Sequence, residues 1–142
     1  ILIRTFVDTS AWIGIAIKRD STHKHASRYA AQLASEKRPL LTTNYVLTEA
    51  YTRVRYDGGH AKALQFDALI AEMVRKRILV VKWITSEMHE EALKIFRSYA
   101  DHQLSVVDCA SFVVAKAAGV SEIFGFDDDF RMMGFVVRPF SS

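Results

Sequence analysis

Short apolar segments alternate with longer amphipathic segments along this chain, and the alternation restricts the possible folds more than any other feature. Apolar runs of strand length predict strands at residues 2–7, 40–43, 78–84, 122–126 and 134–140. Apolar residues recurring at helical spacing predict helices at residues 10–19, 23–38, 44–56, 61–76, 85–100 and 108–119. This order predicts a three-layer α/β/α fold, in which helices cover both faces of a central, mostly parallel sheet of about five strands.

Glycine and proline mark the boundaries between these segments. Pro39 is expected to end the second helix, Gly58 and Gly59 to break the chain between two helices, and Gly119 to close the last helix. No repeat, low-complexity tract or flexible linker interrupts the pattern. We therefore expect residues 1–142 to form a single domain.

Composition limits the possible partners, disulfides and cellular location of the protein, but it does not indicate a function. The formal net charge is +3, which permits a polyanionic partner without indicating one. Cys109 is the single cysteine, so an internal disulfide is excluded, and we expect it to be a small core residue. Trp12 and Trp83 are also expected in the core. No apolar run is long enough to cross a bilayer, and a soluble cytoplasmic protein without membrane contact is expected.

Four acidic residues stand where the expected strands end. Asp8, Asp108 and Asp127 follow strand-like or loop segments, and Glu49 lies within the first two turns of the helix after residues 40–43. In parallel sheets, ligands bind beyond the carboxyl ends of the strands, so these acids are expected to gather there. Carboxylates crowded together repel unless a cation lies among them, and oxygen ligands favour Mg²⁺ or Mn²⁺.

Each acid also has a simpler structural explanation. Asp8 and Asp108 occupy plausible N-cap positions, Glu49 fits a solvated helix face, and residues 127–129 fit a polar turn. For any single position, the structural explanation is the better one. It weakens for the set, because four independent coincidences would be needed to place all the acids at one end of the sheet.

Four motifs give the chain a resemblance to a known family. FVDTSAWI, TTNYVLTEAY, LSVVDCASFVVAKAAGV and FGFDDDFRMMGF occur in this order from the first strand to the last. In order and approximate spacing they resemble the PIN-domain ribonucleases, and among these the VapC toxins of toxin–antitoxin pairs. The resemblance implies a PIN-like fold for the whole chain.

Transferred to this sequence, the family pattern implies that Asp8, Glu49, Asp108 and Asp127 are both the catalytic and the metal-binding acids. Asp127 stands three residues before Phe130, as in the family motif, while Asp129 competes for the same role. The resemblance also implies supporting polar residues near the site: Thr9, Ser10 and Asn44. Val107 departs from the pattern, because a hydroxyl residue frequently precedes the third acid.

The implied activity is Mg²⁺- or Mn²⁺-dependent endonucleolytic cleavage of RNA that leaves a 5′-phosphate, with inhibition of translation and growth as its consequence. Transfer RNA is the family-level expectation, ahead of ribosomal and messenger RNA. Candidate RNA-contacting residues are Arg53, Arg55, Lys62, Arg131 and Arg138. The family also implies a homodimer and a small cognate antitoxin, for which the helices after Pro39 and Gly59 are the expected contacts. Whether one or two metal ions bind stays open.

Other functions fit the sequence less well. A receiver domain requires an adjacent acidic pair after its first strand, whereas Asp8 stands alone. A haloacid-dehalogenase-type phosphatase requires a second aspartate at the position that Ser10 occupies. The five histidines lack the spacing of a zinc site. A PIN-domain nuclease of RNA processing, or a catalytically silent PIN-like binding module, is the remaining alternative.

Overall fold

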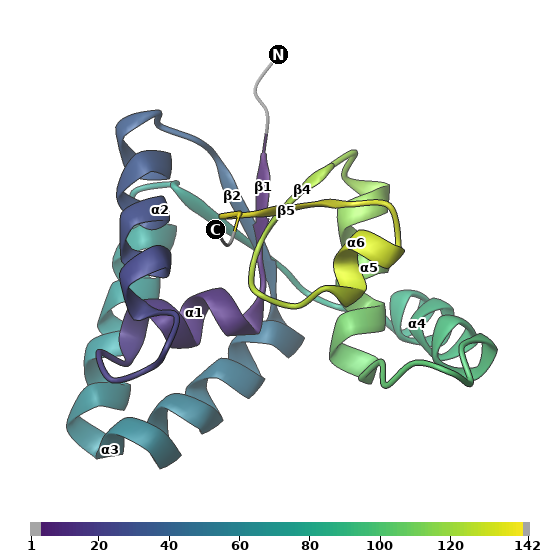
Figure 1. The fold of residues 1–142 in the computed structure, drawn as a ribbon, viewed down its shortest axis with the longest axis horizontal. Helices are drawn as coiled ribbons and strands as arrows, with labels where there is room; N and C mark the ends of the chain where they lie inside the picture. Colours follow the sequence, from purple (N-terminus) through teal and green to yellow (C-terminus); the bar gives the residue numbers. More distant parts are fainter. Residues whose placement is uncertain (1–3, 141–142) are drawn as a thin grey trace.

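The computed structural model describes residues 4–140 and has the predicted α/β/α architecture. The elements are β1 (Thr5–Val7), α1 (Thr9–Ala16), α2 (His23–Ser35), β2 (Leu40–Thr43), α3 (Asn44–Arg75), β3 (Leu79–Lys82), α4 (Ser86–Ser98), α5 (Val106–Ala117), β4 (Glu122–Phe124), α6 (Asp129–Met132) and β5 (Val136–Arg138). Figure 1 shows α1, α2 and α3 to one side of the strands and α4, α5 and α6 to the other. The predicted fold class is confirmed.

The five strands are all parallel and lie in the order β3-β2-β1-β4-β5. Chain order runs outward from β1 through β2 to β3, and then returns to the other side of β1 for β4 and β5. The direction of winding therefore reverses between β1 and β4. Open parallel sheets bind ligands beyond the carboxyl ends of the strands at such a reversal point. The topology thus indicates the ends of β1 and β4 as the place to look for function.

The core combines buried apolar residues of the strands with those of α1, α2, α3 and α5. Trp12 is almost fully buried and packs edge-on against Phe66, with ring centroids 5.9 Å apart. On α5, Phe112 packs edge-on against Phe130 at 5.1 Å. Cys109 is fully buried, which confirms it as a core residue.

Helix α3 is sharply bent, because Gly59 has φ +86° and ψ 178° between two helical halves. A residue with a side chain would be strained at that positive φ. We call residues 44–58 the first arm of α3 and residues 60–75 its second arm. The predicted break is thus confirmed at Gly59, although helical hydrogen bonding continues on both sides of it. Gly119, at φ +69°, ends α5 as expected.

Several expected boundaries are wrong. The first strand, expected at residues 2–7, is described only from Thr5, and residues 1–3 lie outside the described part. Helix α5 begins at Val106 rather than at Asp108, because Ser105 caps it. The short helix α6 was not predicted. Trp83 is 70% exposed rather than in the core, because it follows β3, which is an edge strand of the sheet formed by residues 4–140.

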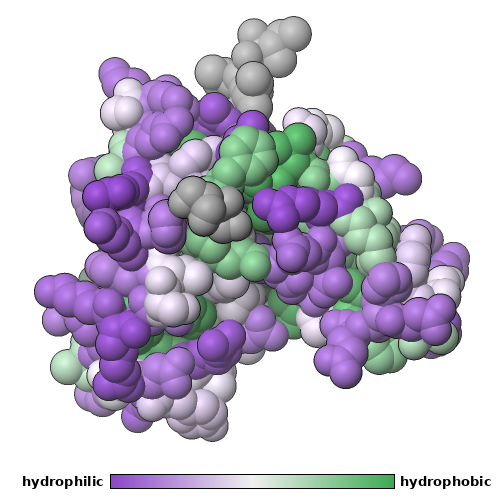
Figure 2. Space-filling view, viewed as in Figure 1, coloured by the Kyte–Doolittle hydropathy of each residue, from purple (hydrophilic) through white to green (hydrophobic). Residues whose placement is uncertain are grey.

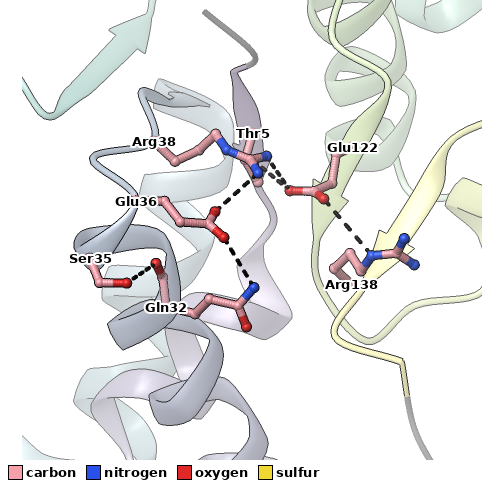
Figure 3. Close-up of polar contacts among 7 residues, drawn as sticks. All are labelled: Thr5, Gln32, Ser35, Glu36, Arg38, Glu122 and Arg138. Atoms are coloured by element: carbon pink, nitrogen blue, oxygen red, sulfur yellow. Dashed lines mark hydrogen bonds and ion pairs between the residues drawn. The ribbon is translucent and has the colours of Figure 1, made fainter.

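A charged network joins β1, β4 and β5 at the other end of the sheet from the ends of β1 and β4 (Figure 3). Glu122 accepts hydrogen bonds from the Thr5 hydroxyl at 2.6 Å and from Arg38 at 3.1 Å, and Arg138 lies 4.0 Å away. Arg138 also stacks on Phe140. Arg138 is thus partly buried against Glu122 and Phe140, which argues against its expected RNA contact.

Across residues 4–140, no helix combines the length and the apolar character that crossing a membrane requires.

Candidate metal centre

Asp8 directly follows β1, at the point where the sheet reverses its winding. Its backbone N–H donates to the Phe124 carbonyl of β4 at 2.9 Å, and its own carbonyl accepts from Ala11 and Trp12 in α1. Asp8 is therefore the N-cap residue of α1 by position, but its carboxylate makes no capping hydrogen bond. The capping explanation for this side chain is thus wrong, and its carboxylate is available for another purpose.

The Asp8 carboxylate is buried with one oxygen unsatisfied. The residue is 3% exposed, and Oδ1 has no hydrogen-bond partner among residues 4–140, while Oδ2 accepts from the Ser10 hydroxyl at 3.2 Å. Burial, and then the nearby charge of Asp108, raises the pKa of Asp8 from 3.8 to about 7. A buried, ionised carboxylate without a partner is strongly destabilising, so this oxygen requires a proton or a cation.

Ser10 and Gly125 fix the position of the Asp8 carboxylate. The Ser10 hydroxyl donates to Asp8 and accepts from the backbone N–H of Phe126 at 2.9 Å, which ties α1 to the segment after β4. A Cβ atom at position 125 would lie 3.1 Å from the Asp8 Cβ and 3.3 Å from the Ser10 Oγ. Glycine at this position therefore allows the β4–α6 segment to approach Asp8 closely.

Asp108 lies in the first turn of α5 rather than at its N-cap. Its backbone N–H donates to the Ser105 hydroxyl at 3.0 Å, and its Oδ2 accepts from the Ser105 N–H at 3.2 Å, which is a capping box. Burial raises the pKa of Asp108 to about 6, and the charges of Asp127 and Glu49 also raise it. The capping box orients one carboxylate oxygen, while the electrostatic effects show that other acids lie nearby.

Asp127 and Asp129 both reach the same place from the β4–α6 segment. Oxygen atoms of Asp108, Asp127 and Asp129 all lie within 4.8 Å of one another. The Asp129 N–H donates to Asp127 Oδ1 at 2.9 Å. Burial, and then the charge of Asp127, raises the pKa of Asp129. The structure thus places both competing aspartates at the cluster, instead of selecting one of them.

The remaining expected residues differ in their surroundings. Glu49 lies on the first arm of α3, close enough to raise the pKa of Asp108. Thr9 is 4% exposed, and its hydroxyl has no hydrogen-bond partner in the described part of the chain. Asn44 instead accepts a hydrogen bond from the Ile84 N–H at 2.7 Å, linking α3 to the segment after β3. Its side chain is occupied in a structural contact.

These observations fit a divalent cation. Within residues 4–140, no ion pair involves Asp8, Glu49, Asp108, Asp127 or Asp129. Their charges are therefore not neutralised by lysine or arginine side chains of the described chain. Carboxylate oxygens are the ligands that hard cations prefer, and the unpartnered oxygen of Asp8 supplies a ligand atom.

Ser10→Ala tests whether the orientation of Asp8 matters for cation binding. Loss of both Ser10 hydrogen bonds is expected to weaken Mn²⁺ binding about tenfold, because partners that orient metal ligands typically contribute 10–100-fold to affinity. Isothermal titration calorimetry measures the change. Ser98→Ala is a matched control, since its hydroxyl bonds only to a helix carbonyl on α4. Equal Mn²⁺ affinity in the two variants would contradict the positioning role.

The expected RNA-contacting arginines and lysine are not equally available. Arg53 and Arg55 are exposed on the first arm of α3, and Lys62 is half-buried just beyond the bend. Arg131 of α6 forms an ion pair with Asp128, the residue that directly precedes this helix. Sequence reasoning missed Gly125 and Ser105, although the glycine between two phenylalanines after a strand was a signal of close approach.

The family model described as the PIN domain matches residues 5–136. The chain is 33% identical over 136 residues to a protein of Mycobacterium tuberculosis named 23S rRNA-specific endonuclease VapC20, covering 94% of this chain and 98% of that protein.

Two solved structures extend the likeness to the fold. The crystal structure of M. tuberculosis VapC20, described as a sarcin–ricin loop cleaving toxin, has a TM-score of 0.79 at 30% identity, covering 93% of this chain and 96% of that one. VapBC2 of Rickettsia felis, bound to a DNA fragment from its promoter, has a TM-score of 0.69 at 11% identity, covering 96% and 98%. At that identity, the second likeness concerns the fold alone.

Proposed function

The chain belongs to the PIN-domain family, and from this premise we propose that it is a metal-dependent endoribonuclease acting as the toxin of a toxin–antitoxin pair. The observation that carries the proposal is the cluster of Asp108, Asp127 and Asp129 near the reversal point of the sheet, together with the buried oxygen of nearby Asp8 that has no partner within residues 4–140. Such a cluster suits a cation that works on an anionic phosphodiester. The 33% identity to VapC20 over nearly the whole chain supports RNA as the substrate class.

Mg²⁺ or Mn²⁺ is the proposed cofactor, held by Asp8, Glu49, Asp108 and Asp127, with Asp129 as the alternative to Asp127. The chemistry that such a cation supplies when bound is the acidification of water and the offset of negative charge on a phosphodiester. Asp108 is held for this role by its capping box, and Asp8 by Ser10. The proposed donor to a phosphate oxygen is the Thr9 hydroxyl, which has no hydrogen-bond partner within residues 4–140. The proposed products carry a 5′-phosphate.

Ribosomal RNA is the substrate that the comparison favours. The relative at 33% identity is named for 23S rRNA, whereas transfer RNA was expected from the family resemblance alone. Cleavage of either RNA accounts for inhibition of translation and growth. The proposal therefore places 23S rRNA first and transfer RNA second.

The proposed partners are a small antitoxin and a second copy of this chain, with action in the cytoplasm. The first arm of α3 buries one apolar face, and its second arm exposes Leu64, Leu69 and Val74. These exposed apolar side chains support a protein contact on the second arm. Light scattering of the isolated protein tests the homodimer, and a monomer mass at micromolar concentration would contradict it.

Mapping the 5′-ends of cellular RNA after induced expression tests the substrate. We expect new 5′-phosphate ends at one or a few positions in 23S rRNA, because an endonuclease cuts inside the RNA chain and each cut produces a new 5′ end. The same induction with Asp8→Asn is the control and is expected to produce no new ends. New ends confined to transfer RNA would overturn the ribosomal target and retain the ribonuclease. No new ends, together with no Mn²⁺ binding, would indicate a silent binding module.

A further inference from the structure

The first arm of α3 carries Arg53 and Tyr56 on the same side as Glu49. Positions 49, 53 and 56 fall within about 60° of one another around a helix of 3.6 residues per turn. At 1.5 Å per residue, Arg53 lies about 6 Å and Tyr56 about 10 Å along the axis from Glu49. Because Glu49 acts electrostatically on Asp108, this side of the helix leads away from the carboxylate cluster. An elongated ligand at the cluster would extend along it.

Tyr56 differs from the other tyrosines on α3. Tyr51 donates to Asp67 at 2.8 Å and packs edge-on against Phe66, and Tyr45 bonds to His89 at 2.7 Å. Tyr56 is 82% exposed, more than any other exposed large hydrophobic or aromatic side chain among residues 4–140, and no hydrogen bond or aromatic contact there involves it. Neither core packing nor a polar contact within the described chain explains an aromatic ring here.

The surroundings of Tyr56 are basic. Arg53 and Arg55 are exposed beside it on the same arm, and Lys18 and Arg19 are exposed on the loop between α1 and α2. The Arg19 guanidinium donates to the carbonyl of Asp57, which fixes this loop against the end of the first arm. Figure 2 shows mostly hydrophilic residues over this part of the molecule, at the lower left. An exposed aromatic ring surrounded by cationic side chains is suited to bind a nucleic acid, which carries both negative charges and flat bases.

We propose that Tyr56 stacks on an unpaired base of the RNA substrate, while Arg53 contacts a backbone phosphate between that base and the bond to be cut. The inference rests on the proposed ribonuclease function and names a recognition element for it. Stacking on an aromatic side chain contributes substantially to single-strand binding and tolerates any base. Arginine contacts to phosphate add a salt-dependent contribution. The substrate segment at this site is therefore single-stranded.

Charge distinguishes RNA from a protein partner at this face. A protein contact typically has an apolar centre, whereas the side chains one turn before Tyr56 on the helix surface, Thr52 and Arg53, are polar or charged, as are Arg55 and Asp57 on either side of it in sequence. The exposed apolar residues of α3 lie instead on its second arm. The two arms are thus assigned to different partners, the first to RNA and the second to protein.

Fluorescence anisotropy with a short, labelled single-stranded RNA of mixed sequence tests the inference. All variants carry Asp8→Asn so that the probe stays intact. Tyr56→Ala is expected to weaken binding about tenfold, whereas Tyr56→Trp retains it, because stacking needs the ring and not the hydroxyl. Phe96→Ala, which removes an exposed ring from α4 on the far side of the molecule, is the matched control and leaves affinity unchanged. Arg53→Gln is expected to reduce the slope of log affinity against log salt by about 1.

Without Asp8→Asn, Tyr56→Ala is expected to raise KM for RNA cleavage with kcat nearly unchanged, since the ring binds substrate far from the reacting atoms. Equal probe affinity for Tyr56→Ala and Phe96→Ala would overturn the inference and leave the ribonuclease proposal standing. Absence of cleavage by the unmodified protein would instead remove the ribonuclease proposal. If Tyr56→Ala changes the molar mass in light scattering without changing RNA affinity, the first arm is a protein interface and the inference is wrong.

Discussion

Asp8→Asn is expected to lower the rate of RNA cleavage about a thousandfold or more at saturating Mg²⁺. A metal ion in a hydrolytic site contributes several kcal/mol to transition-state stabilisation, and each 1.36 kcal/mol corresponds to about a tenfold change in rate. Asparagine keeps the size of the side chain and can still accept from Ser10, but it removes the charge that would hold the cation. Single-turnover cleavage of labelled RNA by purified protein measures the loss.

The same variant is expected to remain folded, which separates a catalytic loss from unfolding. Above pH 7 without metal, a neutral side chain at a site that is 3% exposed is less costly than an ionised carboxylate. Thermal unfolding in the presence of a chelator is therefore expected to give a melting temperature for Asp8→Asn at or above that of the unmodified protein. Glu91→Gln, an exposed acid on α4, is the control and should cleave normally. Undiminished cleavage by Asp8→Asn would refute the mechanism.

The free energy of unfolding of the metal-free protein is expected to fall as pH rises from about 4 to above 7. The pKa of Asp8 is raised to about 7 and that of Asp108 to about 6, both from 3.8, so the folded state binds more protons than the unfolded state across this range. Stability falls with pH wherever the folded state holds the extra protons. Each unit of raised pKa corresponds to about 1.4 kcal/mol, so the two raised pKa values together correspond to a decrease of several kcal/mol. Urea unfolding in a chelator at a series of pH values measures it.

Divalent metal is expected to reverse this pH dependence. A cation binds the ionised carboxylates, so Mn²⁺ should stabilise the protein strongly at pH 8 and little at pH 5, where Asp8 and Asp108 hold protons. In Asp8→Asn, the decrease in stability with pH should shrink, because the group with the larger shift is gone. A metal-free protein that becomes more stable between pH 5 and pH 7 would show that these acids are not buried and crowded as the structure has them.

The sequence predicted the architecture because the information is local. Apolar runs and helical spacing identified all five strands and the six longer helical segments, with Gly59 and Gly119 at the correct breaks. The alternation of strands and helices then required a parallel sheet with helices on both sides. The acidic residues at the ends of the expected strands also pointed to the carboxyl edge of the sheet as the site. The structure brings Asp108 and Asp127 together there. Their role in metal binding remains a proposal.

Other features depend on contacts that no local pattern encodes. Whether the Asp8 carboxylate caps α1 or faces other acids depends on the segment after β4, more than a hundred residues away. That segment supplies the Phe126 N–H that donates to Ser10. Trp83 is exposed because β3 is an edge strand, and strand order is a property of the whole sheet.

The sequence by itself thus determined which elements form and which acids stand at their ends, because hydrophobic periodicity and turn residues act over a few neighbours. Only the tertiary structure decided that the chain reverses its winding between β1 and β4. It also decided that one oxygen of Asp8 is buried without a partner in the described chain, and that the Tyr56 side chain is exposed to solvent beside Arg53. Burial and unsatisfied charge arise from the packing of distant segments, and so they become visible only when those segments are brought together.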